Sequence, residues 1–478
     1  MIFILLRKSK RFLLVLISDF NFPKTETMKK LIILCCAAGI LFSSCNKQLD
    51  LEPRQTISDE IVFTNDANIK KALTGAYDAL SSAFLWGGET LLYSELQAAN
   101  GEISWVGSYN QPREIFNKTI LVNNSYVRDT WLDAYKTINI CNNILAAIDI
   151  VNEDDRDRVR GEALFIRSVV YFDLVNFYAK PYSSGGATGA ESGVPLVLTP
   201  TTGINEESYV SRNTIEEVYT QILEDLSTAE TLLPEENDVF ATNIAAAGFL
   251  SRVYLQMENY QEALIASNRA FDHDTEEQKF LHGSYSAAFN NTELTSEDIF
   301  IIAVNSQDGA NDMHLFWSTG ADGARDGDVE INQKHLDLYE AGDERLDLFY
   351  TGSGAVRSGK WRIRYRNLSI MRLAELYLTR AECNFRLGTA DGATVLSDIS
   401  AIRSRVGLTT TAGDIDLEFI LNERKLELAH EGQAIQDVKR LKKTVDAFPY
   451  DNNKLVLPIP LREMNANPML KQNPGYGG

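Results

Sequence analysis

The chain has 478 residues, 44% of them hydrophobic, so it can bury a large core and is not an intrinsically disordered protein. Its 66 acidic residues outnumber the 46 basic ones, which gives a formal net charge of -20 at pH 7. This charge argues against a nucleic-acid partner, because nucleic-acid affinity comes mostly from Lys and Arg that displace counterions from phosphates. Five cysteines in this length exclude a disulfide framework, so stability is expected to come from packing.

The N-terminal residues 1–44 are predicted to be a signal peptide. Met28-Lys29-Lys30 forms a basic start, and the apolar run over 31–42 is too short to span a bilayer comfortably. Met28 is therefore the expected start of translation. The sequence Ser43-Ser44-Cys45 that follows is similar to a bacterial lipoprotein cleavage site, which implies that Cys45 becomes the lipidated first residue. An ordinary signal peptide with an incidental cysteine is the alternative.

Helical patterns dominate the rest of the chain. A helix is predicted over 131–148. Over 160–179 apolar residues recur on so many sides that this helix is expected to be central and buried. Another helix is predicted over 214–233, where Pro234 stops it. Cys141 and Cys383 lie in helical patterns among apolar neighbours, where buried free thiols are expected, with a disulfide as the alternative.

Two segments resemble tetratricopeptide hairpins. Residues 243–274 form one pattern of two helices hinged near Glu258-Asn259-Tyr260, and the same spacing returns over 373–387 and 393–405 around Gly388. Fainter candidates over 66–80 and 131–148 suggest a scaffold of several stacked helix pairs. No repeat runs through the whole chain, which argues against a pure solenoid.

Long loop-rich segments are predicted between these helices, over 86–124, 183–193 and 281–359. Loops of this length in a helical protein usually carry function. Residues 360–366 alternate basic with apolar side chains, which predicts a strand with one basic face. A solvated or salt-bridged face is the preferred interpretation of that strand, and a preference for an acidic sugar is the alternative.

Aromatic residues outside helical periodicity stand beside amides and carboxylates in these loops. Sugar recognition requires such flat apolar rings together with planar polar groups. The candidate ligand contacts are Trp86, Trp105, Tyr109, Asn110, Phe316 and Trp317. For each ring, a loop anchor packed into the core is the alternative.

Three glutamates, Glu423, Glu427 and Glu431, lie four residues apart on one predicted helix face. Two carboxylates that flank a bond are typical of a glycosidase. Adjacent helix turns, however, point these side chains in parallel instead of from opposite sides of a sugar. Pairing with cations such as Arg403, Arg424 or Lys425 is therefore the preferred interpretation, and no enzyme activity is predicted.

No cofactor is predicted either. The five histidines lack a metal-binding spacing, and the sequence has no nucleophile elbow, P-loop or dinucleotide fingerprint. The acidic segment 322–330 offers oxygen ligands at Asp322, Asp326, Asp328 and Glu330, so calcium is the alternative. Arg325 within this segment favours a solvated acidic turn.

Four ordered blocks resemble the SusD/RagB family of nutrient-binding outer-membrane lipoproteins of Bacteroidetes. They include Arg160-Gly161-Glu162-Ala163 with Gly193-Val194-Pro195-Leu196; Met371-Arg372-Leu373 with Arg380-Ala381-Glu382 and Arg403-Ser404-Arg405; Glu423-Arg424 with Glu431-Gly432; and Leu457-Pro458-Ile459-Pro460 with Asn473-Pro474-Gly475-Tyr476. With Cys45 at one end and Tyr476 at the other, the resemblance spans the mature chain.

The resemblance implies a mostly α-helical SusD-like fold, with tetratricopeptide-like helix pairs, long loops and a few short strands in one domain over 45–478. It also implies a lipid-anchored protein at the cell surface that captures an oligosaccharide and delivers it to a SusC-like TonB-dependent transporter in the outer membrane. A peptide or another nutrient ligand in the same role, a surface glycoside hydrolase, and a helical-repeat assembly factor that binds only protein are the alternatives.

Overall fold

The computed structural model describes residues 63–203, 206–309 and 311–477. The predicted signal peptide over 1–44, the start at Met28 and the lipidation site Cys45 lie outside the described residues. The single domain over 45–478 stays a prediction.

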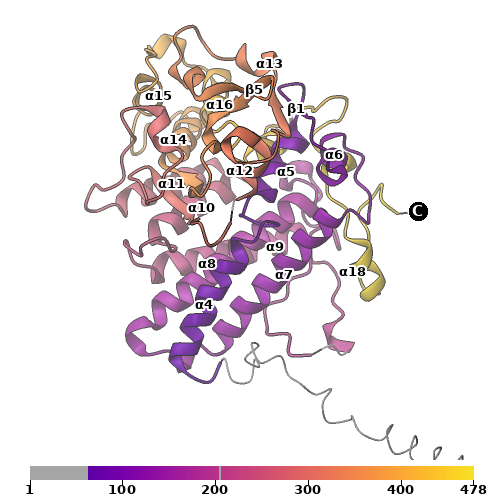
Figure 1. Ribbon diagram of the computed structural model, residues 1–478. Coiled ribbons are helices and arrows are strands. Elements are labelled where there is room, and N and C mark those ends of the chain that lie inside the picture. Colours follow the sequence, from indigo (N-terminus) through magenta and orange to yellow (C-terminus); the bar gives the residue numbers. More distant parts are fainter. Residues whose placement is uncertain (1–62, 204–205, 310, 478) are drawn as a thin grey trace, which may run out of the picture. The chain divides into compact units, whose positions relative to one another are not determined.

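The long helices pack in pairs that follow one another along the chain (Figure 1). The pairs are α4 (Asp66–Leu80) with α7 (Ser125–Ala146), α8 (Glu153–Tyr178) with α9 (Ile215–Leu232), α10 (Asn243–Gln256) with α11 (Tyr260–Asp272), and α14 (Leu373–Leu387) with α15 (Val395–Ser404). Contacts of α7 with α8, of α9 with α10 and of α11 with α14 join one pair to the next. The predicted scaffold of stacked helix pairs is therefore confirmed.

Helix α8 is the central buried helix, as its apolar surface predicted. Phe165, Tyr171 and Phe177 are at most 1% exposed. The helix begins at Glu153, earlier than predicted, because three acidic residues over 153–155 stand in its first turn, where they interact favourably with the positive end of the helix dipole.

Local signals set the ends of the neighbouring helices. At α9, the Thr214 hydroxyl accepts a hydrogen bond from the backbone N–H of Glu217, and the Glu217 carboxylate accepts one from the backbone N–H of Thr214. This capping box satisfies two N–H groups that the helix leaves unpaired. Helix α14 ends at Gly388, whose φ of 68° is the left-handed conformation that favours glycine.

The segments predicted as loops contain more regular structure than expected. The first holds α5 (Glu89–Ala98), β1 (Ile103–Trp105) and α6 (Asn110–Phe116). The third holds β2 (Asp298–Ile302), α12 (Asp312–Trp317), β3 (Val329–Ile331), α13 (Gln333–Leu336), β4 (Phe349–Gly352) and β5 (Ala355–Ser358). The remaining elements are β6 (Leu368–Arg372), α16 (Leu417–Glu427), α17 (Ala434–Arg440) and α18 (Leu461–Ala466).

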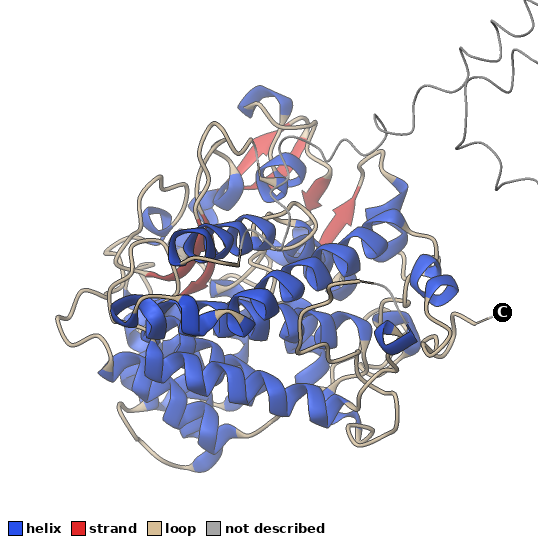
Figure 2. Ribbon diagram, turned by 90° about the horizontal axis from the view of Figure 1, so that it is seen from below, coloured by secondary structure: helices blue, strands red, loops and turns tan. Residues whose placement is uncertain are grey.

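The strands form three separate antiparallel pairs, β1 with β3, β2 with β6 and β4 with β5. Figure 2 shows them as short red arrows among the helices. The pair β4–β5 lies within the third loop-rich region, β2 of that region pairs with β6 outside it, and β1 with β3 ties the first region to the third. The few short strands of the expected fold are confirmed.

The prediction of a strand over 360–366 is wrong. Residues Gly359–Trp361 form a 3-10 turn, and an irregular segment leads from there to β6. The alternation fails because the Lys360 ammonium is buried against Glu431, while Ile363 is 47% exposed. Lys360 is therefore a core residue and not part of a basic surface.

Cys141 and Cys383 are free and buried, as preferred from their apolar surroundings. Burial raises the pKa of each thiol to about 12, so both stay protonated at neutral pH. Among the described helices, none is both long enough and apolar enough to cross a membrane.

Candidate functional site

Two of the aromatic residues predicted to contact ligand, Trp86 and Trp317, belong to the core. Trp86 is 4% exposed, lies stacked at 5.6 Å from Phe249, and donates its indole N–H to Asp173 at 2.6 Å. Trp317 is fully buried, and its ring centre lies 4.8 Å from that of His430. Neither indole has a face left for a sugar, so the structure corrects both predictions to core anchors.

Trp105 and Phe316 are corrected in the same way. Both are buried, and their ring centres lie 5.7 Å apart. The pairing of β1 with β3 turns Trp105 inward, and the single turn of helix α12 does the same for Phe316. These rings support the surface above them instead of forming it.

Tyr109 and Asn110 are the two predicted contacts that lie exposed. The Tyr109 ring is 39% exposed and packs edge-on against Tyr126 and Phe316, at ring-centre distances of 6.4 and 6.1 Å. We call the patch formed by Ser108, Tyr109, Asn110, Tyr126 and Arg325 the Tyr109 surface. Whether it contacts a ligand stays a prediction.

Cation–π and polar contacts fix the orientation of the Tyr109 ring. The Arg325 guanidinium lies 4.0 Å from the ring centre, and it donates to Asp328 at 2.6 Å and to Ser108 at 2.9 Å. Asn110 accepts a hydrogen bond from Arg113 at 3.0 Å. The patch therefore offers an oriented aromatic ring, a hydroxyl and an amide to solvent.

Buried carboxyl groups lie close to the same patch. Burial raises the pKa of Glu89 to about 9 and that of Asp312 to about 7. Burial also raises the pKa of the half-buried Tyr126 hydroxyl, and the two carboxyls raise it further. The Tyr93 hydroxyl donates a hydrogen bond to the Glu89 carboxyl. At neutral pH the Glu89 carboxyl is therefore protonated and uncharged, so it can be buried without a cation beside it.

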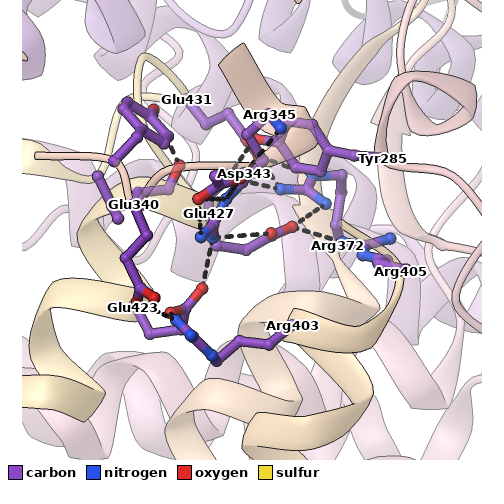
Figure 3. Close-up of polar contacts among 12 residues, drawn as sticks. Tyr285, Glu340, Asp343, Arg345, Arg372, Arg403, Arg405, Glu423, Glu427 and Glu431 are labelled. Atoms are coloured by element: carbon purple, nitrogen blue, oxygen red, sulfur yellow. Dashed lines mark hydrogen bonds and ion pairs between the residues drawn. The ribbon is translucent and has the colours of Figure 1, made fainter. Parts of the chain in front are cut away.

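The three glutamates of the glycosidase alternative lie in a buried network of ion pairs (Figure 3). Arg372, at the end of β6, contacts Glu297, Glu427 and Glu431 at 2.8, 3.0 and 2.7 Å. Glu423 pairs with Arg345 and, at 2.8 Å, with Arg403. Arg405 binds both Glu297 and Glu427. Glu431 lies past the end of α16, so the three carboxylates do not share one helix face.

This ion network does not have the electrostatics of an acid–base pair. Burial alone would raise the pKa of Glu427, but Arg405, Arg372 and Arg345 lower it to about 2. Glu427 is therefore a structural carboxylate that is charged at neutral pH. The preferred interpretation, pairing with cations, is confirmed for Arg403, while Arg424 pairs with Glu375 and Asp437, and Lys425 with Glu102.

Two of the carboxylates in segment 322–330 that would have to bind calcium already accept hydrogen bonds or form ion pairs within the protein. Asp322 accepts hydrogen bonds from Thr319 at 2.9 Å and from Tyr350 at 3.0 Å. Asp328 is buried and bound by Arg325. Within the part of the chain that the structure describes, no group of three or more His, Cys, Asp or Glu side chains is arranged to hold a metal ion.

Comparison with protein families gives two matches along the chain. Residues 47–255 match the SusD-like family described as starch-binding and associating with the outer membrane, and residues 355–454 match the SusD family itself. The chain belongs to the SusD/RagB family. The resemblance of the four sequence blocks is thus confirmed.

Two individual relatives in the SusD/RagB family match over very different lengths. SusD-like protein P2 of Formosa agariphila is 23% identical, over 94% of this chain and 100% of the relative. The starch-binding protein SusD of Bacteroides thetaiotaomicron is 30% identical over 123 residues, which are 23% of this chain and 22% of that relative.

Solved structures of the SusD superfamily share the fold. A putative sugar-binding protein from Bacteroides vulgatus superposes with a TM-score of 0.76 at 26% identity, over 86% of this chain and 98% of that one. A laminarin-binding SusD-like protein superposes with a TM-score of 0.71 at 23% identity, over 86% and 100%. The predicted mostly α-helical SusD-like fold is confirmed.

Proposed function

We propose that this SusD/RagB protein captures an oligosaccharide at the cell surface and delivers it to a SusC-like TonB-dependent transporter. The observation that carries the proposal is the match of residues 47–255 to a starch-binding, outer-membrane-associated family, together with a fold shared with sugar-binding and laminarin-binding proteins over 86% of the chain. The protein acts without making or breaking a bond.

The Tyr109 surface is the ligand contact in this proposal. An exposed ring oriented by Arg325 offers an apolar face to the C–H groups of a pyranose, and Asn110 offers an amide to its hydroxyls. Trp105 and Phe316 support the surface from below. Because the glutamates of the ion network are buried and paired with arginines, they are unsuited to hydrolysis.

Attachment to the outer membrane belongs to the same proposal. The basic and apolar segment before Cys45 supports acylation at that residue, and the polar sequence Asn46-Lys47-Gln48 would then form a tether. Expressing Cys45→Ala tests this step. The variant should leave the membrane fraction and lose the acyl mass that the wild type carries at this cysteine; an unchanged fractionation would contradict the anchor.

Affinity gels and calorimetry with a panel of polysaccharides test the capture step. We expect one glycan to bind the wild type and Tyr109→Ala to weaken that binding at least about tenfold, or 1.4 kcal/mol. Tyr209→Ala is the matched control, because Tyr209 is also 39% exposed but lies outside the Tyr109 surface. Equal affinities of the two variants would remove the Tyr109 surface from the proposal.

Failure of every glycan to bind would favour the peptide version of the same role. A surface hydrolase would instead release reducing ends from the bound glycan, and that release would stop in Glu427→Gln. A protein-binding assembly factor would retain its partners in Tyr109→Ala and bind no glycan.

A further inference from the structure

A second site lies in a pocket of about 160 Å³ between the C-terminal end of α5, the segment that joins α16 to α17, and residues 441–445. We call it the C-terminal pocket. None of the residues that form the Tyr109 surface lines it. An apolar cavity of about 150 Å³ can hold one six-membered ring, so the pocket has the size for a single cyclic group.

The walls of the C-terminal pocket combine aliphatic and polar side chains. The aliphatic ones include Ala98, Ile103, Leu421, Leu428, Leu441 and Val445. Glu95, His430 and Gln433 line the same space with groups that can exchange hydrogen bonds with hydroxyls. A ring with one C–H-rich face and several hydroxyls matches this mixture better than a purely apolar ligand would.

His430 carries the signs of a residue held for a ligand. Its side chain is almost fully buried, yet its Nδ1 has no hydrogen-bond partner among the described residues. Its φ of 65° lies in the left-handed region, which costs energy for a residue with a side chain. Strain and an unpaired buried nitrogen on one pocket-lining residue are both expected where a ligand completes the hydrogen bonding.

Three basic residues, Arg424, Lys425 and Lys443, and three acidic residues, Glu95, Glu102 and Asp437, line the pocket, and Arg424 is paired with Asp437 at 3.1 Å. Lys425 and Lys443 both line it, and Lys425 is paired with Glu102 at 3.1 Å. Lys443 has no ion-pair partner in the part of the chain that the structure describes. Desolvation by the surrounding protein lowers the pKa of Lys443, the nearby Asp437 raises it, and Lys425 and Arg440 lower it. A bound carboxylate would give this exposed ammonium the ion-pair partner that it lacks among the described residues.

We propose that the C-terminal pocket binds a sugar acid, as one pyranose ring that carries a carboxylate. The C–H face packs on the aliphatic wall, the hydroxyls meet Glu95, His430 and Gln433, and the carboxylate pairs with Lys443. This inference rests on the proposed glycan-binding function and narrows it to glycans that contain uronic acid residues.

Calorimetry and saturation-transfer NMR with free monosaccharides test the pocket directly. Glucuronate and galacturonate should bind the wild type at least tenfold more tightly than glucose and galactose do, with an affinity that falls as salt is added. Lys443→Met should abolish this preference. Lys442→Met is the matched control, because the adjacent Lys442 pairs with Glu258 and does not line the pocket.

A third variant gives a change of opposite sign. Glu102→Gln removes the carboxylate that pairs with Lys425 and should strengthen uronate binding about threefold, since a second cation becomes available. Uronates that bind no more tightly than neutral sugars, or Lys443→Met and Lys442→Met variants that behave alike, would overturn the inference.

The two proposals fail in different ways. If neutral polysaccharides bind and depend on Tyr109 while uronates do not bind, the pocket inference fails and glycan capture stands. If uronate monosaccharides bind in a Lys443-dependent way but no polysaccharide does, the pocket assignment stands and glycan capture fails.

Discussion

Around α8, aromatic rings fill the interior of the protein. Around α16, arginines and glutamates fill it instead. Phe165, Phe249 and Phe300 pack with ring centres 5.1 to 6.3 Å apart. Arg372 and Glu427, in the ion network, are as deeply buried as these rings. Apolar packing depends on volume and tolerates exchange of one hydrophobic residue for another. A buried ion network tolerates no such exchange, because a single missing partner leaves a charge without compensation.

The ion network overlaps two of the four blocks that carry the family resemblance. Arg372 and Arg405 stand in the second block and Glu423 and Glu431 in the third, and all four belong to the ion network. Residues that function only as a complete set must keep their identities. These two blocks therefore reflect how the region around α16 is built, and they do not name a ligand.

Removing the central cation should give the largest effect. Arg372→Met keeps the bulk of the side chain but leaves Glu297, Glu427 and Glu431 without their shared partner. We expect the free energy of unfolding to fall by about 3–5 kcal/mol, measured by urea denaturation. A loss below about 1 kcal/mol would mean that the network only fills space.

The second-largest effect is expected in the pH dependence of the free energy of unfolding, through the buried His335. Burial, with Lys425 nearby, lowers the pKa of His335 to about 4, so the unfolded chain binds this proton first as the pH falls below about 6.5. Stability from this residue is therefore present at pH 7 and is lost between pH 6.5 and 4. Relative to His335→Gln, the wild type should lose about 2–3 kcal/mol between pH 7 and 4.5. Parallel pH profiles of the two proteins would contradict the burial argument.

A smaller effect is expected in the helix-pair region. Thr214→Ala removes one half of the capping box at α9 and should cost about 1 kcal/mol of unfolding free energy. Thr214→Ser keeps the hydroxyl and serves as the control, with nearly wild-type stability. Equal losses in both variants would point to the methyl group instead of the cap.

The smallest effect should come from an ion pair outside the network. Arg269 binds Glu230 at 2.7 Å, but its side chain is 39% exposed, so water screens the interaction. Arg269→Met should cost less than about 1 kcal/mol. A loss as large as that of Arg372→Met would show that burial does not decide the strength of these pairs.

Much of the scaffold could be predicted from the sequence because its signals are local. Apolar spacing, the Thr214–Glu217 cap and Gly388 are each contained within one helix and its ends. Helix α5 was missed since it is buried on nearly every side while its sequence mixes Glu89, Glu95 and Gln97 with leucines. Such a helix has neither a polar stripe nor a continuous apolar run.

The candidate site was harder to predict because its contacts join distant segments. The four buried rings differ from Tyr109 only in what covers them, and the cover comes from residues far away in the chain, as His430 covers Trp317. The partners of Glu427 likewise lie at positions 372 and 405. Local sequence patterns carry no record of such pairings.

The two buried thiols provide the protein with its own probes of local opening. Cys141 belongs to α7 and Cys383 to α14, and the two side chains lie in separate apolar clusters. A thiol reagent can reach either sulfur only when its surroundings open. The two modification rates therefore report separately on how often the structure around each cysteine opens. The rates of local opening around α7 and around α14 can thus be followed in the unmutated chain.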